Sequence, residues 1–265
     1  MKSIISETDK KELQEARNLL EDPGFAIKIT NLIGMPIEKG IEKLPKRWSD
    51  KIGEMTKAAL FKASEAAIFT IKDIPGEKSS NPWHKLGVMA SGGVGGLFGI
   101  AALAIELPIS TTIMLRSIAE IARSQGESVK SIETKLACLE VFALGGKSRS
   151  SKSAESGYYA VRALLAKSIS EAAEFVAKKG IIEEGAPVLV KLIAKISQRF
   201  GIQITEKVAA QALPAIGAIG GAIINTIFID HFQDVAKGHF IVRKLERIYG
   251  KETVKKLYEE LPLKG

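Results

Sequence analysis

The sequence has few of the residues that anchor secreted or metal-binding proteins. Cys138 is its single cysteine, so no disulfide can form within the chain and a zinc site built from cysteine pairs is excluded. Only three histidines are present, and none belongs to an H-E-x-x-H motif. We therefore predict no metal site and no cofactor. The first 22 residues are charged throughout and lack the apolar core of a secretory signal, which favours a reducing, cytoplasmic location.

Signals for β-strands are also nearly absent. No stretch of alternating apolar and polar residues is bounded by an Asn-Gly or Asp-Gly turn. Apolar residues recur at helical spacing instead. The sequence therefore predicts an all-α fold, with an N-terminal helix and linker in residues 1–35 and a single multi-helix domain in residues 36–265.

Helix caps and helix breakers place most of the helix ends. Ser6, with Asp9 three residues on, resembles a capping box and predicts a first helix that stops before Pro23. Further helices are expected over about 49–71, 129–144, 158–179 and 187–200. Pro108 is predicted to be the first-turn proline of a helix that ends at Gly126.

Two long runs, residues 86–105 and 208–229, contain no charged residue and are rich in glycine. Gly92 and Gly96 are four residues apart, as are Gly217 and Gly221, so each pair lies on one helix face and lets another backbone approach. The two runs are predicted to form central helices. They form either a tightly packed core or a pair of helices that enters a membrane.

Length and composition point in different directions on the membrane question. About 20 apolar residues can span a bilayer, which favours insertion. Against it, the second run carries Gln211, Pro214 and Asn225, and both runs are rich in small residues. We expect buried helices or reversible membrane contact rather than permanent spanning.

Charge and aromatic content narrow the choice of partner. The formal net charge is +8, which suits an acidic partner such as an anionic membrane surface. Aromatic residues make up 6% of the chain and do not alternate with basic residues, so we predict no nucleic-acid binding.

Four polar residues lie unexpectedly within or beside apolar runs and are candidates for catalysis. Glu106 lies between Ile105 and Leu107, where a carboxylate needs a helix N-terminus or a cation nearby. Structural capping or pairing is the alternative interpretation. The full candidate set is Glu106, Arg116, Glu140 and His231.

A second set of candidates, for ligand binding, lies near the C-terminus: Asn225, His231, Asp234 and His239. His231 and Asp234 are three residues apart and could converge on one ligand. His239 falls on the apolar stripe that includes Phe228 and Phe232, so it faces the packed side. The simpler interpretation is a hydrogen-bonded core histidine beside a solvated acidic face.

Three stretches of the sequence together resemble the EcsC protein family. The first is Glu106-Leu107-Pro108 with Thr111-Thr112 and Arg116-Ser117-Ile118-Ala119. The second is Ala212-Leu213-Pro214 with Gly217, Gly220-Gly221-Ala222, Asn225, Phe228 and His231-Phe232. The third is His239-Phe240 with Arg243, Leu245 and Glu246. The resemblance runs from about Pro36 to Tyr249.

The resemblance implies a bacterial protein connected with export, because the family is named for a protein encoded beside the subunits of an ABC exporter. Some members are labelled hydrolases or peptidases. Our leading hypothesis is a cytoplasmic accessory protein at the inner face of the cell membrane, which binds the anionic surface or a membrane protein. A hydrolase built on the four catalytic candidates is one alternative. A carrier of a small apolar ligand, held between the glycine-rich helices, is another.

Overall fold

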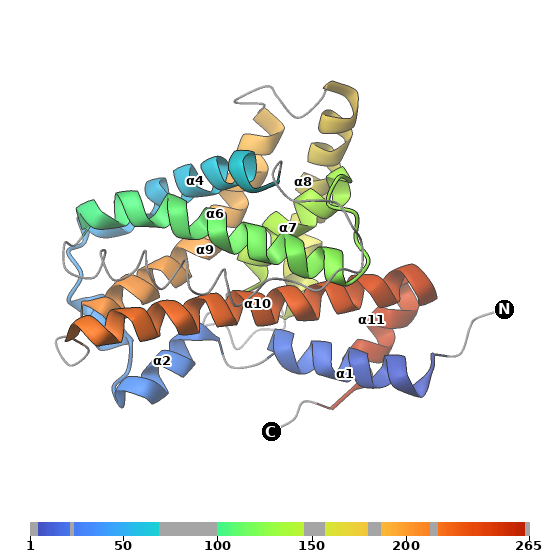
Figure 1. Ribbon diagram of the computed structural model, residues 1–265, viewed down its shortest axis with the longest axis horizontal. Helices are drawn as coiled ribbons and strands as arrows, with labels where there is room; N and C mark the ends of the chain where they lie inside the picture. Colours follow the sequence, from blue (N-terminus) through green and yellow to red (C-terminus); the bar gives the residue numbers. More distant parts are fainter. Residues whose placement is uncertain are drawn as a thin grey trace.

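The computed structural model describes residues 5–21, 24–68, 100–145, 157–179, 187–212 and 217–262. All regular structure in these ranges is helical, which confirms the predicted all-α fold (Figure 1). The helices are α1 (Glu7–Glu21), α2 (Phe25–Ile33), α3 (Glu38–Glu42), α4 (Arg47–Ile68), α6 (Ile100–Ser124), α7 (Ile132–Leu144), α8 (Tyr158–Lys179), α9 (Pro187–Gln211), α10 (Gly217–Tyr249) and α11 (Lys251–Glu260).

The first helix begins as the capping-box pattern predicted. The backbone N–H of Asp9 donates to Ser6 Oγ at 3.0 Å, and Ser6 Oγ donates to the Asp9 carboxylate at 2.7 Å. Leu13, Ala16 and Leu20 are buried where α1 packs along α10. The N-terminal helix thus shares the core of the later helices.

Two predicted helix boundaries are wrong. Pro108 does not begin a helix but lies inside α6, which starts at Ile100. A proline there deprives the carbonyl of Ala104 of its helical donor, and this is tolerated because Ala104 is exposed and water can bond its carbonyl. The helix expected to end near Phe200 continues as α9 to Gln211, through Gly201.

α6 lies at the centre of the described helices and contacts α4, α7 and α10. It runs in the same direction as α10, since Gln233 on α10 donates to Ser117 on α6, and Arg243 donates to Glu127 just beyond the end of α6. Central packing of the Pro108 helix is therefore observed. Pro214 and the glycines of residues 92–99 lie outside the described residues.

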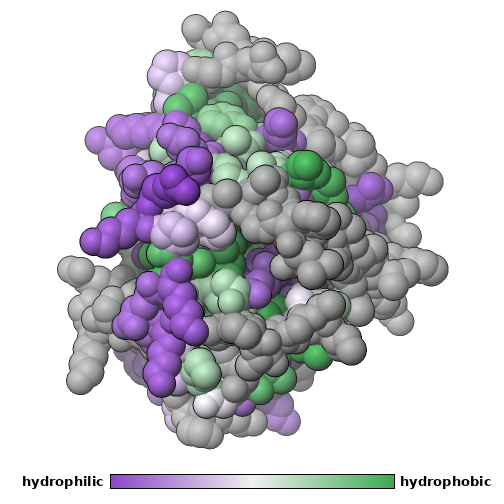
Figure 2. Space-filling model, turned by 90° about the vertical axis from the view of Figure 1, so that its left-hand side faces the viewer, coloured by the Kyte–Doolittle hydropathy of each residue, from purple (hydrophilic) through white to green (hydrophobic). Residues whose placement is uncertain are grey.

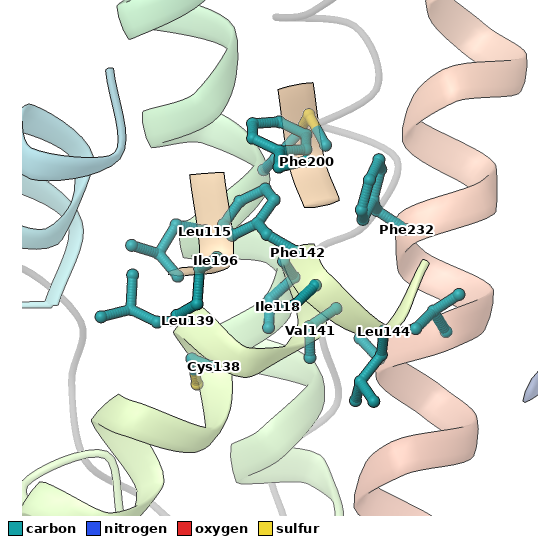
Figure 3. Packing of buried hydrophobic residues seen from close by; sticks show 14 of the residues in the cluster. Leu115, Ile118, Cys138, Leu139, Val141, Phe142, Leu144, Ile196, Phe200 and Phe232 are labelled. Atoms are coloured by element: carbon teal, nitrogen blue, oxygen red, sulfur yellow. The ribbon is translucent and has the colours of Figure 1, made fainter. Parts of the chain in front are cut away.

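Aromatic side chains fill the core between α7, α9 and α10 (Figure 3). Phe142 lies 4.7 Å from Phe200 and 5.5 Å from Phe232, measured between ring centroids. Cys138 is buried one turn before Phe142, and desolvation raises the pKa of its thiol, so it is held as a packed thiol.

No helix in the described part of the chain combines the length and hydropathy that a membrane span needs.

Candidate functional site

Buried and partly buried polar side chains gather in two places. The first, here called the His239 network, joins α7, α8 and α10 and comprises Glu140, Tyr158, Arg162, His239 and Glu246. The second, here called the Lys207 cluster, joins α6, α9 and α10 and comprises Glu106, Gln203, Lys207, Gln211 and Asn225.

His239 lies at the centre of the first network and has no exposed surface. Its Nδ1 is 2.9 Å from the Tyr158 hydroxyl, and its Nε2 is 3.7 Å from the Glu140 carboxylate. Desolvation lowers the pKa of His239 well below its ordinary value, and the positive charges of Arg162 and Arg243 lower it further. The imidazole is therefore neutral at physiological pH.

Glu140 has the opposite shift for the same reason. Desolvation raises its pKa to about 7, although Arg162 and Arg243 act to lower it. The carboxyl group is thus poised to exchange a proton near neutrality. Because the helices enclose both Glu140 and His239, the pair is closed to a large substrate in this structure.

Fixed charges surround this titrating pair. Arg162 on α8 binds Glu246 on α10 through two hydrogen bonds, of 2.6 and 3.0 Å. One turn after His239 on α10, Arg243 donates a hydrogen bond of 2.9 Å to Glu127, which also pairs with Arg247. Burial would raise the pKa of Glu127, but hydrogen bonds from Arg243 and Thr134 and the charges of Arg243 and Arg247 together hold the pKa below its ordinary value.

The Lys207 cluster is built around a buried ion pair. Lys207 Nζ lies 2.9 Å from Glu106 Oε1, and the side chains are 0% and 8% exposed. The ammonium group also lies 5.1 Å from the ring centroid of Phe228, within cation–π range. The sequence predicted a helix N-terminus or a cation beside Glu106, and the structure supplies a cation from α9.

Amide side chains extend the cluster along α9 and across to α10. Gln203, Lys207 and Gln211 are four residues apart and therefore lie on one face of α9. Gln211 Nε2 donates to Asn225 Oδ1 at 3.4 Å. Within the described residues, both polar atoms of the Gln203 amide and Asn225 Nδ2 are buried without a hydrogen-bond partner.

The predicted candidates are divided between these places rather than gathered in one site. Glu106 and Asn225 belong to the Lys207 cluster, and Glu140 and His239 belong to the His239 network. Arg116 is exposed and does not join Glu106, which pairs with Lys207 instead.

The two remaining candidates bond to different groups. His231 Nε2 lies 2.6 Å from the carbonyl oxygen of Gly145, at the end of α7. Asp234 is 44% exposed and lies 3.6 Å from Lys28. Across the described ranges, no three His, Cys, Asp or Glu side chains are arranged to hold a metal ion.

Sequence reasoning missed Lys207, Gln203, Tyr158 and Arg162. Lysine and arginine on helices are mostly solvated, so Lys207 and Arg162 carry no signal of burial on their own. One signal was available: Lys207 directly precedes the uncharged run from Val208, on the face that carries Gln203 and Gln211.

The fold is all-α, and residues of the two buried clusters, including Glu106, Asn225, His239 and Glu246, come from the stretches quoted above. The chain belongs to the EcsC protein family, whose family model matches residues 7–245. That match extends from α1 into α10 and includes both clusters except Glu246. No curated protein and no solved structure matches the chain.

Proposed function

We propose that this protein is an accessory protein of transport or secretion that binds the anionic inner face of the cell membrane peripherally. The observation that carries the proposal is a basic stretch from the end of α3 into the first turn of α4, residues 43–48, here called the basic turn. Lys43, Lys46 and Arg47 are exposed there, and the stretch contains no acidic residue. Trp48 lies partly buried at its end and suits the interface between headgroups and acyl chains.

Exposed apolar side chains lie near the same end of the molecule. α4 packs along α6, and both helices start at the left-hand end in Figure 1. Near the start of α6, Ile105 is 71% exposed and Ile109, one turn later, is 49% exposed. Figure 2 looks onto this end and shows hydrophobic surface bordered by hydrophilic side chains.

The two features would act through different forces. Each basic residue near an anionic surface contributes about 1 kcal/mol, and salt screens that contribution. Isoleucines that enter the interface add a contribution from burial that salt does not weaken. Binding of this kind is reversible, which suits an accessory protein that leaves and rejoins its site.

Sedimentation with liposomes of increasing phosphatidylglycerol content tests the proposal. We expect binding to rise with anionic lipid and to fall in high salt. The variant Lys43→Gln/Lys46→Gln/Arg47→Gln removes three charges, worth about 3 kcal/mol, and should weaken binding on the order of 100-fold at low salt.

A matched control removes the same charge elsewhere. Lys167 and Lys178 are exposed on α8, and Lys191 is exposed in the first turns of α9, all outside the basic turn. Their replacement by glutamine should weaken binding far less than the basic-turn variant does. If both variants lose binding equally, net charge and not the basic turn determines binding to the liposomes. An unmodified protein that never sediments would overturn membrane binding and leave a membrane protein as the partner.

A further inference from the structure

Three side chains of the His239 network lie within reach of one another, with His239 between the other two. The Tyr158 hydroxyl is 2.9 Å from Nδ1 of the imidazole, and a Glu140 carboxylate oxygen is 3.7 Å from Nε2. Nε2 is buried and has no hydrogen-bond partner among the described residues. Buried polar atoms in native proteins are nearly always bonded, so this nitrogen needs a specific explanation. An approach of about 1 Å would bring Glu140 within hydrogen-bond distance of it.

The chemistry of the three groups ties the tautomer of His239 to the proton on Glu140. A neutral imidazole carries its hydrogen on one nitrogen and accepts a hydrogen bond at the other. Tyr158 can match either tautomer, because a hydroxyl both donates and accepts. Glu140 matches both only by changing its protonation state. The acid donates to a bare Nε2, and the carboxylate accepts from Nε2–H.

We infer that Glu140, His239 and Tyr158 form a proton-operated switch at the junction of α7, α8 and α10. In the acid form, Glu140 donates to Nε2, and Nδ1–H donates to the Tyr158 oxygen. In the basic form, Nε2–H donates to the Glu140 carboxylate, and the Tyr158 hydroxyl donates to Nδ1. Between the two forms the Glu140 proton moves to Nε2, the Nδ1 proton leaves for solvent and the Tyr158 hydroxyl turns. One proton is released, and the imidazole is neutral in both forms.

The charged and titratable groups that face the switch come from four helices. They are Tyr159 and Arg162 on α8, Arg243 and Glu246 on α10, Tyr258 on α11 and Glu21 on α1. Arg162 is bound to Glu246, and Arg243 is bound to Glu127. The positive charges of the two arginines oppose a second proton on the imidazole. When Glu140 ionises, Nε2–H is therefore the donor placed to satisfy its carboxylate.

Two further observations suit Glu140 to operate the switch. Burial raises its pKa to about 7, so its proton is exchanged in the physiological range. Its side chain is 6% exposed, whereas that of His239 has no exposed surface, so water can reach the carboxyl group. The switch does not depend on membrane binding.

Nuclear magnetic resonance of the unaltered protein tests the inference. In ¹⁵N-histidine-labelled protein, a nitrogen that carries hydrogen and one that does not have widely separated chemical shifts, which identifies the tautomer. The chain has three histidines, so His84→Gln and His231→Gln assign the other two sets of signals. We expect the hydrogen on Nδ1 at about pH 5 and on Nε2 at about pH 9, with one transition near pH 7. The ¹³C signal of the Glu140 carboxyl group should move in the same transition.

The coincidence of the Glu140 and His239 transitions is the decisive result. If Glu140 titrates while His239 keeps one tautomer, the two groups are independent and there is no switch. If both imidazole nitrogens carry hydrogen at the acid end, His239 takes the proton instead of Glu140, and the inference is wrong.

Two variants on α7 provide the matched comparison. Glu140→Gln has no proton to lose, so His239 should keep one tautomer across the whole pH range. Glu133→Gln removes an exposed carboxylate from the same helix and should leave the transition unchanged. A tautomer change that persists in Glu140→Gln would assign the transition to another group and overturn the inference. Because the coupled titration is measured on the unaltered protein, the test does not depend on the folding of either variant.

Discussion

Lys207 and Glu106 form a deeply buried ion pair, in which the Lys207 side chain has no exposed surface and the Glu106 side chain is 8% exposed. Truncating Lys207 to alanine would leave the Glu106 carboxylate buried without a cation. We expect Lys207→Ala to lower the free energy of unfolding by about 3–5 kcal/mol. Urea unfolding followed by circular dichroism measures this loss.

Two further variants test whether the loss of stability comes from breaking the Lys207–Glu106 pair or from removing any positive charge. Arg116 is exposed, so Arg116→Ala should change the free energy of unfolding by no more than about 0.5 kcal/mol. The double variant Glu106→Leu/Lys207→Met replaces both charges by apolar groups and should recover most of the loss. A double variant as unstable as Lys207→Ala would argue against the ion pair as the cause.

Glu140 predicts a particular pH dependence. Its pKa rises from 4.5 to about 7 on folding, so the folded state holds the proton more tightly than the unfolded state. The contribution of Glu140 to stability therefore falls by about 3 kcal/mol as pH rises from about 4.5 to 7, and it levels off above that. Glu140→Gln should abolish this fall, which makes the variant more stable than the unaltered protein at pH 8 but not at pH 4.5.

Urea unfolding at several pH values checks the prediction, with Glu54→Gln as the control. Glu54 is exposed on α4, so its replacement controls for the loss of one carboxylate charge. His239 works in the opposite sense: with its pKa lowered on folding, it removes stability as pH falls through its ordinary range. A Glu140→Gln variant that still loses stability between pH 4.5 and 7 would contradict the role of Glu140.

The sequence indicated what Glu106 needs but not what supplies it. A carboxylate between Ile105 and Leu107 must find a helix N-terminus or a cation, and that much follows from desolvation. Lys207 lies 101 residues further along the chain, beyond the reach of helical spacing. Arg116, the nearest basic candidate in sequence, is exposed, and the cation comes from α9 instead.

At the scale of helices, Gly238 sets how closely α1 approaches α10. A Cβ atom there would lie 2.7 Å from Leu20 Cγ and 3.0 Å from the carbonyl oxygen of Ala16. We expect Gly238→Ala to destabilise the fold by about 1–3 kcal/mol, because a backbone oxygen cannot move aside. Gly53 on α4 has nothing within 4 Å of the same position. Gly53→Ala should instead stabilise by about 0.5–1 kcal/mol, and thermal unfolding of both variants compares them.

Helix ends were predicted best where local chemistry determines them. The Ser6 cap and the Pro187 start follow from side chains within one turn, and both agree with the structure. Pro108 and Gly201 break this rule because exposure to water and tertiary packing compensate for the local cost. The predicted close packing at Gly96 lies outside the described residues.

At the scale of the whole molecule, the first helix, α1, packs against the last two, α10 and α11. Glu12 pairs with Lys244 at 2.8 Å, Glu15 pairs with Lys237 at 2.5 Å, and Arg17 donates to backbone carbonyls of Tyr258 and Leu261. Leu13 has no exposed surface. We therefore expect Leu13→Ala to lower the stability of the entire fold by about 2–5 kcal/mol.

The fluorescence of Trp48 on α4, measured in a Trp83→Phe background, reports whether this loss is transmitted. Circular dichroism and Trp48 fluorescence should then show the same lowered midpoint. If the fluorescence transition does not move, residues 1–35 unfold independently, as the boundary predicted at residue 35 requires.

The pairing of α1 with α10 also has a consequence for protein synthesis. Glu12 and its partner Lys244 are separated by 232 residues. At about 5–20 residues per second, the ribosome needs roughly 10–50 s to deliver the second after the first. Throughout that interval the apolar stripe of α1, with Leu13, Ala16 and Leu20, is without its native cover. The nascent chain is therefore expected to need a holding chaperone until the last helices emerge.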